Sequence, residues 1–180
     1  MLTDVKLAFI GAGGMGEAMV RGLLTQQLVA PDAITASHPR QTRLEELAAL
    51  FAIRPTTDNR AAAVGADIVV LCIKPQVLPE VLREMRGAIP EQAFVLSIVA
   101  GARIRTIAEG LDHPGVVRCM PNTPAQVGEG MTVWTATPEV SPRQRAQAQA
   151  ILRALGKDLA VADEAFLDMA TAISGTVASA

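Results

Sequence analysis

A run of glycines near the amino terminus could hold a phosphate group. The residues are Gly11-Ala12-Gly13-Gly14-Met15-Gly16, which match the pattern G-x-G-x-x-G. They stand between an apolar run, residues 5–10, and a segment with apolar side chains at helical spacing, residues 17–24. This order predicts a strand, a tight turn and a helix whose unpaired amides attract a diphosphate. We therefore expect the amides of residues 11–16 to cradle a dinucleotide; the alternative is a glycine turn that serves packing alone.

The residues after the second expected strand, residues 34–37, indicate which dinucleotide would bind. Enzymes that use NAD usually carry Asp or Glu there to accept hydrogen bonds from the ribose 2'-hydroxyl. This chain has Ser37-His38-Pro39-Arg40 instead. Ser37 and His38 can donate hydrogen bonds to a 2'-phosphate and Arg40 can add a charge-assisted contact, so we predict NADP(H). The alternative is that His38 and Arg40 are ordinary solvated loop residues.

Strand-like and helix-like segments alternate along the chain, which is typical of a doubly wound α/β fold. The continuously apolar run at residues 66–73 predicts a strand covered on both faces, hence one near the centre of a parallel sheet. We predict a Rossmann-type parallel sheet in residues 1–162 and a short helical extension, the start of a dimerisation region, in residues 163–180. The other expected strands are residues 53–56, 94–99, 116–120, 131–135 and 159–161, and the other expected helices begin near residues 43, 58, 79, 104, 142 and 163.

Capping residues mark several of these helices. Asp58 is expected to cap the short third helix, and Ser141-Pro142-Arg143-Gln144 predicts a capping box, with Gly156 ending that helix. Asp163 is a candidate cap for the last helix. One apolar stripe of that helix must be buried on the chain's own sheet or against a partner, which would make a homodimer. The stripe consists of Phe166, Met169, Ala170, Ile173 and Val177.

The composition disfavours several other classes of protein. Sixteen basic and eighteen acidic residues are scattered along the 180 residues, so there is no basic stripe for nucleic acid. Apolar runs such as residues 68–73 are too short to cross a bilayer, and the first residues lack a signal-peptide pattern, so we expect a cytoplasmic protein without membrane contact. Cys72 and Cys119 lie in apolar runs and are expected to be reduced thiols; without a neighbouring histidine they predict no metal site.

Three further segments, together with the glycine turn, resemble pyrroline-5-carboxylate reductases. The first is residues 66–76, which end in Ile73-Lys74-Pro75-Gln76, similar to the family's V-K-P-Q. The second is residues 118–130, similar to R-x-M-P-N-T-P-x-x-V-G-E-G. The third is residues 167–175, similar to the helix that approaches S-G-S-G-P-A-Y, from which the chain departs after Gly175. The four segments occur in the family's order, so the resemblance implies its Rossmann domain and the start of its helical region.

The resemblance also implies roles for individual residues, at the carboxyl ends of the expected strands where open α/β sheets bind ligands. His38 would occupy the 2'-phosphate position and Asn59 would reach the adenosine. The residues that would wrap the diphosphate are Ile10, Gly11, Ala12, Gly13, Gly14 and Met15, and those that would line the cofactor crevice are Ile73, Lys74, Pro75, Ile98, Val99 and Ala100. The candidates on the nicotinamide side are Asn122, Thr123 and Ser174, and no residue is assigned a catalytic role.

The resemblance implies one reaction, and two other functions stay open. Family members reduce 1-pyrroline-5-carboxylate, a cyclic imino acid, to proline by moving a hydride from NADPH to the C=N carbon. A catalytically inactive NADP(H)-binding module or sensor would use the same cradle without turnover. Another imine or β-hydroxyacid reductase is less favoured, because no lysine follows Lys157 to match the catalytic lysine of β-hydroxyacid dehydrogenases.

Overall fold

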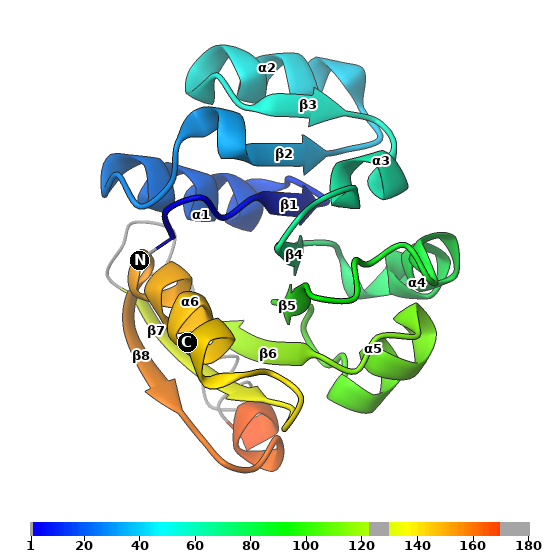
Figure 1. Ribbon diagram of the computed structural model, residues 1–180, viewed down its shortest axis with the longest axis vertical. Helices are drawn as coiled ribbons and strands as arrows, with labels where there is room; N and C mark the ends of the chain where they lie inside the picture. Colours follow the sequence, from blue (N-terminus) through cyan, green and yellow to red (C-terminus); the bar gives the residue numbers. More distant parts are fainter. Residues whose placement is uncertain (1, 123–129, 170–180) are drawn as a thin grey trace, which may run out of the picture.

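The computed structural model describes residues 2–122 and 130–169. Eight strands form one sheet in the order β3-β2-β1-β4-β5-β6-β7-β8 (Figure 1). All neighbouring strands are parallel except β6 and β7, which are antiparallel. The strands are β1 (Leu7–Ile10), β2 (Ile34–Ser37), β3 (Arg54–Thr56), β4 (Ile68–Leu71), β5 (Phe94–Ser97), β6 (Val116–Pro121), β7 (Gly130–Ala136) and β8 (Gly156–Ala160).

Helices cover both faces of the sheet (Figure 1). On one face, Met19, Leu47 and Ile151 of helices α1, α2 and α6 form a core with Phe9 and Val70 of the strands. On the other face, α3, α4 and α5 pack against the alternate side chains of β1, β4 and β5. This arrangement confirms the predicted doubly wound α/β fold. The helices are α1 (Gly14–Thr25), α2 (Gln41–Phe51), α3 (Asn59–Ala63), α4 (Leu78–Met85), α5 (Ile104–Leu111) and α6 (Pro142–Arg153), with 3-10 turns η1 (Pro31–Ala33) and η2 (Pro75–Val77).

The centre of the sheet follows from the most apolar runs. All four residues of β1, of β4 and of β5 are buried, as expected for parallel strands that carry helices on both sides. The strand order reverses between β1 and β4, because the chain first builds β2 and β3 on one side of β1 and then crosses to the other. Ligands of open α/β sheets bind at the carboxyl ends of the strands beside such a reversal.

The predicted helix caps are present. The Asp58 carboxylate accepts a 3.0 Å hydrogen bond from the Ala61 amide at the start of α3. At α6, the Ser141 hydroxyl accepts from the Gln144 amide while the Gln144 side chain accepts from the Ser141 amide, which completes the capping box. Both caps are local features of the sequence, and they fix where these two helices begin.

Two predictions near the carboxyl end differ from the structure. The sheet was predicted to be parallel, and it is so except at one pair of strands, since β7 runs antiparallel to β6. Gly156 was expected to end α6, which instead ends at Arg153, and Gly156 is the first residue of β8. Its φ of +129° favours glycine, and a side chain there would overlap the backbone of Gly130 on β7. Gly156 is therefore required by the close approach of two strands.

Residues 165–169 form a helical turn after β8. Asp163 accepts a hydrogen bond from the Ala165 amide at 2.8 Å, in agreement with the predicted cap. Leu167 is fully buried, but Phe166 and Met169 are 53% and 58% exposed. The chain's own sheet therefore does not bury these two members of the predicted apolar stripe. The stripe's other members, Ala170, Ile173 and Val177, lie outside the described residues.

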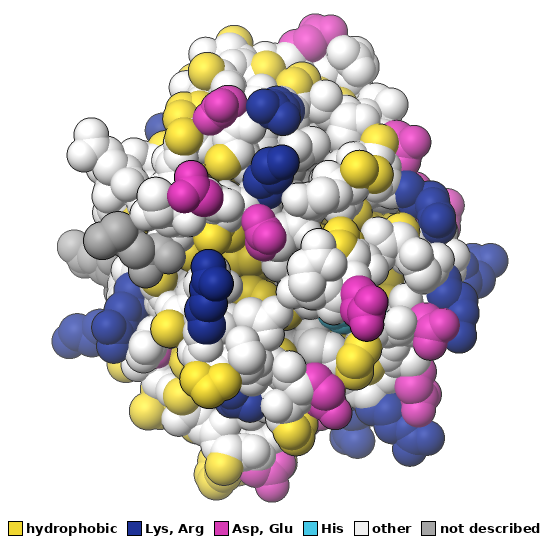
Figure 2. Space-filling view, viewed as in Figure 1, with side chains coloured by type: hydrophobic (Ala, Val, Ile, Leu, Met, Phe, Trp, Pro, Cys, Tyr) yellow, Lys and Arg dark blue, Asp and Glu magenta, His cyan; other side chains and the backbone are white. Residues whose placement is uncertain are grey.

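The surface carries both signs of charge. Figure 2 shows basic and acidic side chains interspersed over the face in view, with no continuous basic stripe on that face. Among the residues that the structure describes, no helix is long and apolar enough to cross a membrane.

Both cysteines are free thiols, and Cys119 donates to the Ser97 carbonyl oxygen at 3.3 Å.

Candidate functional site

The sequence-predicted site residues converge on one edge of the sheet. Gly11, His38, Cys72 and Ile98 directly follow the parallel strands β1, β2, β4 and β5, so their backbones lie along the carboxyl edge. Asn122 follows β6 at the same edge because β6 is parallel to β5. Segments far apart in the sequence thereby lie along one edge of the sheet.

The glycine turn between β1 and α1 leaves room only for glycine at its first position. Gly11 has a φ of +82°, and a side chain there would overlap the Ile73 side chain and lie 3.1 Å from the Cys72 carbonyl oxygen. In contrast, a Cβ placed on Gly14 would meet nothing within 4 Å. The turn is thus tightly packed on its inner side and open at the start of α1, where a ligand could approach the backbone.

The amides available to a phosphate are fewer than the sequence suggests. The Gly11 and Ala12 amides both donate to the Ser37 carbonyl oxygen, at 3.1 and 3.0 Å, and the Gly13 amide donates to the Gly11 carbonyl oxygen. Within the part of the chain that the structure describes, the amides of residues 14–16 have no acceptor, as expected for the first turn of a helix. These three donors, at the positive end of the α1 dipole, suit the diphosphate of a dinucleotide.

Arg43 braces the turn, a role that sequence reasoning missed. Its Nε donates to the Ala12 carbonyl oxygen at 3.3 Å, and its Nη2 pairs with Glu17 at 2.5 Å. These bonds, with a second ion pair from Arg21, hold the pKa of the Glu17 carboxyl below its ordinary value despite partial burial. Because Glu17 lies in the first turn of α1, its pairing keeps an otherwise repulsive charge neutralised beside the phosphate donors.

The loop after β2 presents hydrogen-bond donors. The Arg40 amide donates to His38 Nδ1 at 3.1 Å, so in the neutral ring the proton resides on Nε2. Burial, with the nearby charges of Arg40 and Arg43, lowers the pKa of the His38 imidazole. His38 is therefore a neutral Nε2–H donor at neutral pH, and the Arg40 side chain is exposed beside it.

A hydrogen-bond chain connects β2 to helix α4. The Ser37 hydroxyl donates to Asn59 Oδ1 at 2.6 Å, and Asn59 Nδ2 donates to Glu84 Oε2 at 2.8 Å. Sequence reasoning expected Ser37 to donate to the 2'-phosphate, but its side chain is fully buried and its hydroxyl donates to Asn59 instead. Glu84 was missed, because its contact with Asn59 spans 25 residues and nothing in the local pattern of α4 indicates it.

A cavity of about 280 Å³ lies beside this chain. Its apolar wall contains Pro39, Ile73, Val77 and Val81, and its polar rim contains Asn59 and two carboxylates. The carboxylates are Glu80 and Glu84 of α4. An apolar slot with a polar rim at the carboxyl edge suits a planar heterocycle carried on a sugar.

The segments after β4 and β5 occupy the expected positions. Lys74 and Pro75 are exposed at the start of η2, and Lys74 accepts a backbone hydrogen bond from Val77. After β5, Val99 is buried and Ala100 is exposed, while the Ile98 amide donates to the Leu71 carbonyl oxygen. Their backbones thus lie at the carboxyl edge of the sheet, between the glycine turn and β6.

Asn122 has a structural partner. Its Oδ1 accepts a 3.0 Å hydrogen bond from the Met131 amide of β7, and within residues 2–122 and 130–169 its Nδ2 group has no acceptor. This bond agrees with a rigid Pro-Asn turn and fixes the amide for contact with a ligand. The other two nicotinamide-side candidates, Thr123 and Ser174, lie outside the described residues.

These features coincide with a known family. The model of the family described as NADP oxidoreductase coenzyme F420-dependent matches residues 6–101, from the residue before β1 to the loop after β5. The matched stretch contains the glycine turn, the β2 loop and the 280 Å³ cavity. The chain belongs to this family.

Pyrroline-5-carboxylate reductases are among the proteins similar to this chain, which confirms the predicted resemblance. The Synechocystis sp. enzyme is 37% identical over 173 residues, which cover 96% of this chain and 64% of the relative. The structure of the Coxiella burnetii enzyme gives a TM-score of 0.90 with 31% identity, covering 94% and 63% of the two chains. That of the Plasmodium falciparum enzyme with NADP bound gives 0.84 with 25% identity, covering 98% and 64%. The chain therefore spans less than two thirds of the length of these relatives.

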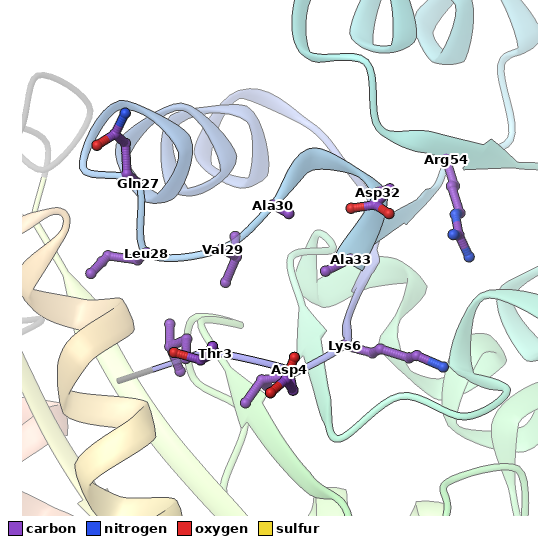
Figure 3. Close-up of a pocket in the computed structure, with 12 residues that line it drawn as sticks. Thr3, Asp4, Lys6, Gln27, Leu28, Val29, Ala30, Asp32, Ala33 and Arg54 are labelled. Carbon is purple, nitrogen blue, oxygen red and sulfur yellow. The ribbon is translucent and has the colours of Figure 1, made fainter.

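A second cavity lies far from this family's crevice. It has a volume of about 470 Å³ and is lined by Lys6, Asp32 and Arg54, which stand at the amino ends of β1, β2 and β3 (Figure 3). This cavity is larger than the 280 Å³ cavity, but it lies at the opposite edge of the sheet from the glycine turn. Among the described residues, no cluster of three His, Cys, Asp or Glu side chains could hold a metal ion.

Proposed function

We propose that this chain binds NADP(H) and serves the NADPH-dependent reduction of 1-pyrroline-5-carboxylate to proline. The observation that carries the proposal is the unpaired amide row of residues 14–16, next to a turn at Gly11 too tight for any side chain. The similarity to pyrroline-5-carboxylate reductases over most of this chain supports the substrate. The family description also names coenzyme F420, but the similar reductases give no support for it.

Each part of the crevice would hold a different part of the cofactor. The amides at the start of α1 would bind the diphosphate, and His38 Nε2–H with Arg40 would bind the 2'-phosphate. The 280 Å³ cavity would take the adenine, with Asn59 at the ribose. The backbones of residues 73–75 and 98–100 would line the path to the nicotinamide, near Asn122.

The protein's share of the reaction is positioning. NADPH, when bound, supplies the hydride. The cavity would hold the adenine, the α1 amides the diphosphate and the β2 loop the 2'-phosphate. Contacts at these separate points would limit the motion of the bound cofactor. The Asn122 Nδ2 group would donate a hydrogen bond on the nicotinamide side, since its Oδ1 is already engaged by Met131. Groups that would hold the imino acid are assigned to the region that begins at residue 163.

A catalytically inactive NADP(H)-binding module is the second candidate. It would use the amides of residues 14–16 and the 280 Å³ cavity without catalysing a reaction. Both functions need the same cradle, so cofactor binding alone does not separate them.

The proposal extends to domain organisation and assembly. Residues 1–162 would form the NADP(H)-binding domain, and residues 163–180 would begin the helical substrate and dimerisation region. The exposed Phe166 and Met169 side chains support a homodimer through this segment. A cytoplasmic location would match the supply of NADPH and of a small soluble substrate.

Calorimetric titration with NADPH and NADH, followed by an assay with pyrroline-5-carboxylate, tests the proposal. We expect NADPH to bind at least about tenfold more tightly than NADH, and its absorbance at the nicotinamide band to fall when the imino acid is added. Equal affinity for both nucleotides would contradict the assignment of the β2 loop. Binding without turnover would favour the inactive module.

A pair of arginine variants provides the control. Arg40→Ala should reduce NADPH affinity about tenfold and leave NADH affinity unchanged. Arg54→Ala removes the same charge at the opposite edge of the sheet, beside the 470 Å³ cavity. It should therefore leave both affinities unchanged, and an equal effect of the two variants would indicate a general charge effect instead of a phosphate site.

A further inference from the structure

Arg118 of β6 is a buried cation with two carboxylate partners. Its side chain is 2% exposed, and it is the largest fully buried side chain in the described residues. Nη1 donates to Glu164 at 2.6 Å and Nη2 donates to Asp168 at 2.7 Å. Because a guanidinium does not lose its proton in proteins, its burial requires such partners. The proposed cofactor contacts use none of these three residues.

Glu164 has a second role in the same cluster. Its Oε1 atom also accepts a 2.8 Å hydrogen bond from the amide of Ile104, the first residue of α5. The N-cap residue of α5, Arg103, makes no capping bond with its side chain, so Glu164 supplies the cap from a distant part of the chain. One carboxylate oxygen therefore connects β6, α5 and the segment after β8.

The two carboxylates define an orientation as well as a contact. Glu164 and Asp168 are four residues apart, which is about one helical turn, and both bind the same planar guanidinium. Two attachment points on one turn fix its rotation about its own axis. In keeping with this, Leu167 is buried while Phe166 and Met169 face outward.

The cluster joins two segments that each carry a nicotinamide-side candidate. Arg118 lies three residues before Pro121, the last residue of β6, and Asn122 directly follows that strand. Asp168 lies in the segment, residues 167–175, that leads in sequence to Ser174. The ion pairs thus link the strand at the nicotinamide end of the crevice to the start of the region assigned to the substrate.

We propose that Arg118 is a positioning residue that sets the orientation of the substrate region relative to the nicotinamide end of the crevice. The inference rests on the proposed function, because the imino acid must be aligned with the cofactor for hydride transfer. An apolar side chain could fill the Arg118 position without the desolvation of a charge. The directional pairs with Glu164 and Asp168 provide the orientation that an apolar side chain would lack.

Hydrogen–deuterium exchange and steady-state kinetics of the full chain test this proposal in parallel. The variants are Asp168→Asn, which leaves the Arg118–Glu164 pair intact, and Arg118→Lys, which can reach one carboxylate. Glu109→Gln is the matched control, because it breaks the exposed Arg105–Glu109 pair on α5. We expect both test variants to raise the exchange rate of the amides of residues 165–169 about tenfold and the control to leave it unchanged.

Cofactor and substrate should respond differently. NADPH affinity should stay within about twofold of the parent chain in all variants, while the KM for pyrroline-5-carboxylate rises about fivefold in Asp168→Asn and Arg118→Lys. Unchanged exchange in both test variants would overturn the proposal, as would faster exchange with an unchanged KM and kcat, which indicates a purely structural role. If the parent chain shows no turnover, the proposed function fails, and exchange alone decides whether Arg118 orients residues 165–169.

Discussion

The Ser37 hydroxyl donates a 2.6 Å hydrogen bond to Asn59 Oδ1, and this contact determines which way the Asn59 amide points. Since Oδ1 is engaged, the amide's nitrogen side must face Glu84, to which it donates at 2.8 Å. The Glu84 carboxylate is thus connected to the end of β2 through two hydrogen bonds. Many NAD enzymes instead carry a carboxylate directly at the end of this strand.

The first prediction follows from this carboxylate. Glu84→Gln should raise the ratio of NADPH to NADH affinity about three- to tenfold, because it removes a negative charge near the proposed 2'-phosphate position. Glu80→Gln is the control, since Glu80 lines the same cavity but Asn59 donates its hydrogen bond to Glu84. Calorimetry with both nucleotides gives the ratio, and equal ratios for Glu84→Gln and the parent chain would show that the charge of Glu84 is not sensed.

A second prediction concerns pH and His38. Because the pKa of His38 is lowered, mainly by burial, the ring is neutral at pH 7.5 and takes up a proton only below its ordinary range. Lowering the pH from 7.5 to below the ordinary range of histidine should therefore add a cation at the proposed phosphate site and strengthen NADPH binding about threefold to tenfold relative to His38→Gln. Titrations at several pH values check this. Parallel pH profiles for the two proteins would rule His38 out as a contact of the phosphate.

The third prediction separates the two sides of the glycine turn. Gly11→Ala should lower the free energy of unfolding by about 2–4 kcal/mol, because of its left-handed φ and the overlap with Ile73. Gly14→Ala should change it by less than about 1 kcal/mol, since a Cβ there meets open space in a helix. Denaturant unfolding followed by circular dichroism gives both values. Similar losses in the two variants would contradict the described packing of the turn.

The fourth prediction concerns Asp158 of β8, which accepts hydrogen bonds from Trp134, Gln149 and Arg153 at 2.8–2.9 Å. Burial tends to raise the pKa of the Asp158 carboxyl, but these donors outweigh it and lower the pKa. A lowered pKa means that the carboxylate adds stability above its unfolded value, about pH 4, and loses it as the pH falls through the folded value.

Asp158→Asn should therefore cost about 1–3 kcal/mol at pH 7 and progressively less below pH 4. Urea unfolding monitored by the emission of Trp134, the chain's single tryptophan, measures the difference. A destabilisation of the same size at pH 7 and pH 3 would show that the ionised form of Asp158 is not what stabilises β8.

Much of the fold could be predicted because it is encoded in short segments. The glycine turn, the Asp58 cap and the Ser141 capping box each depend on residues within a few positions of one another. The direction of β7 was missed, although residues 122–129 are too few for a parallel crossover from β6, which needs roughly a dozen residues or more. Periodicity identified Phe166 as part of an apolar stripe, but only the Arg118 contacts show which side of that helical turn faces the sheet.

The residues of the candidate site also differ in whether local sequence could place them. Gly11, His38 and Asn59 stand directly after strands or at a helix start, so the alternation of elements was enough to place them. Glu84 contacts Asn59, 25 residues away in the sequence, and Arg43 contacts Ala12, 31 residues away. Local sequence patterns do not indicate such contacts. The predicted cradle of residues 11–16 was too wide for the same reason, because the carbonyl group of Ser37 occupies two of its amides.

Arg43 has a consequence for attempts to redesign nucleotide preference. The Arg43 guanidinium contacts the carbonyl oxygen of Ala12 in the glycine turn, and its charge contributes to lowering the pKa of His38 on the neighbouring loop. Placing an aspartate at position 38 or 40, the obvious change toward NAD, would offer Arg43 a competing partner to Glu17. Loss of the Arg43–Glu17 ion pair would loosen the glycine turn, so a successful redesign would also change the residue at position 17.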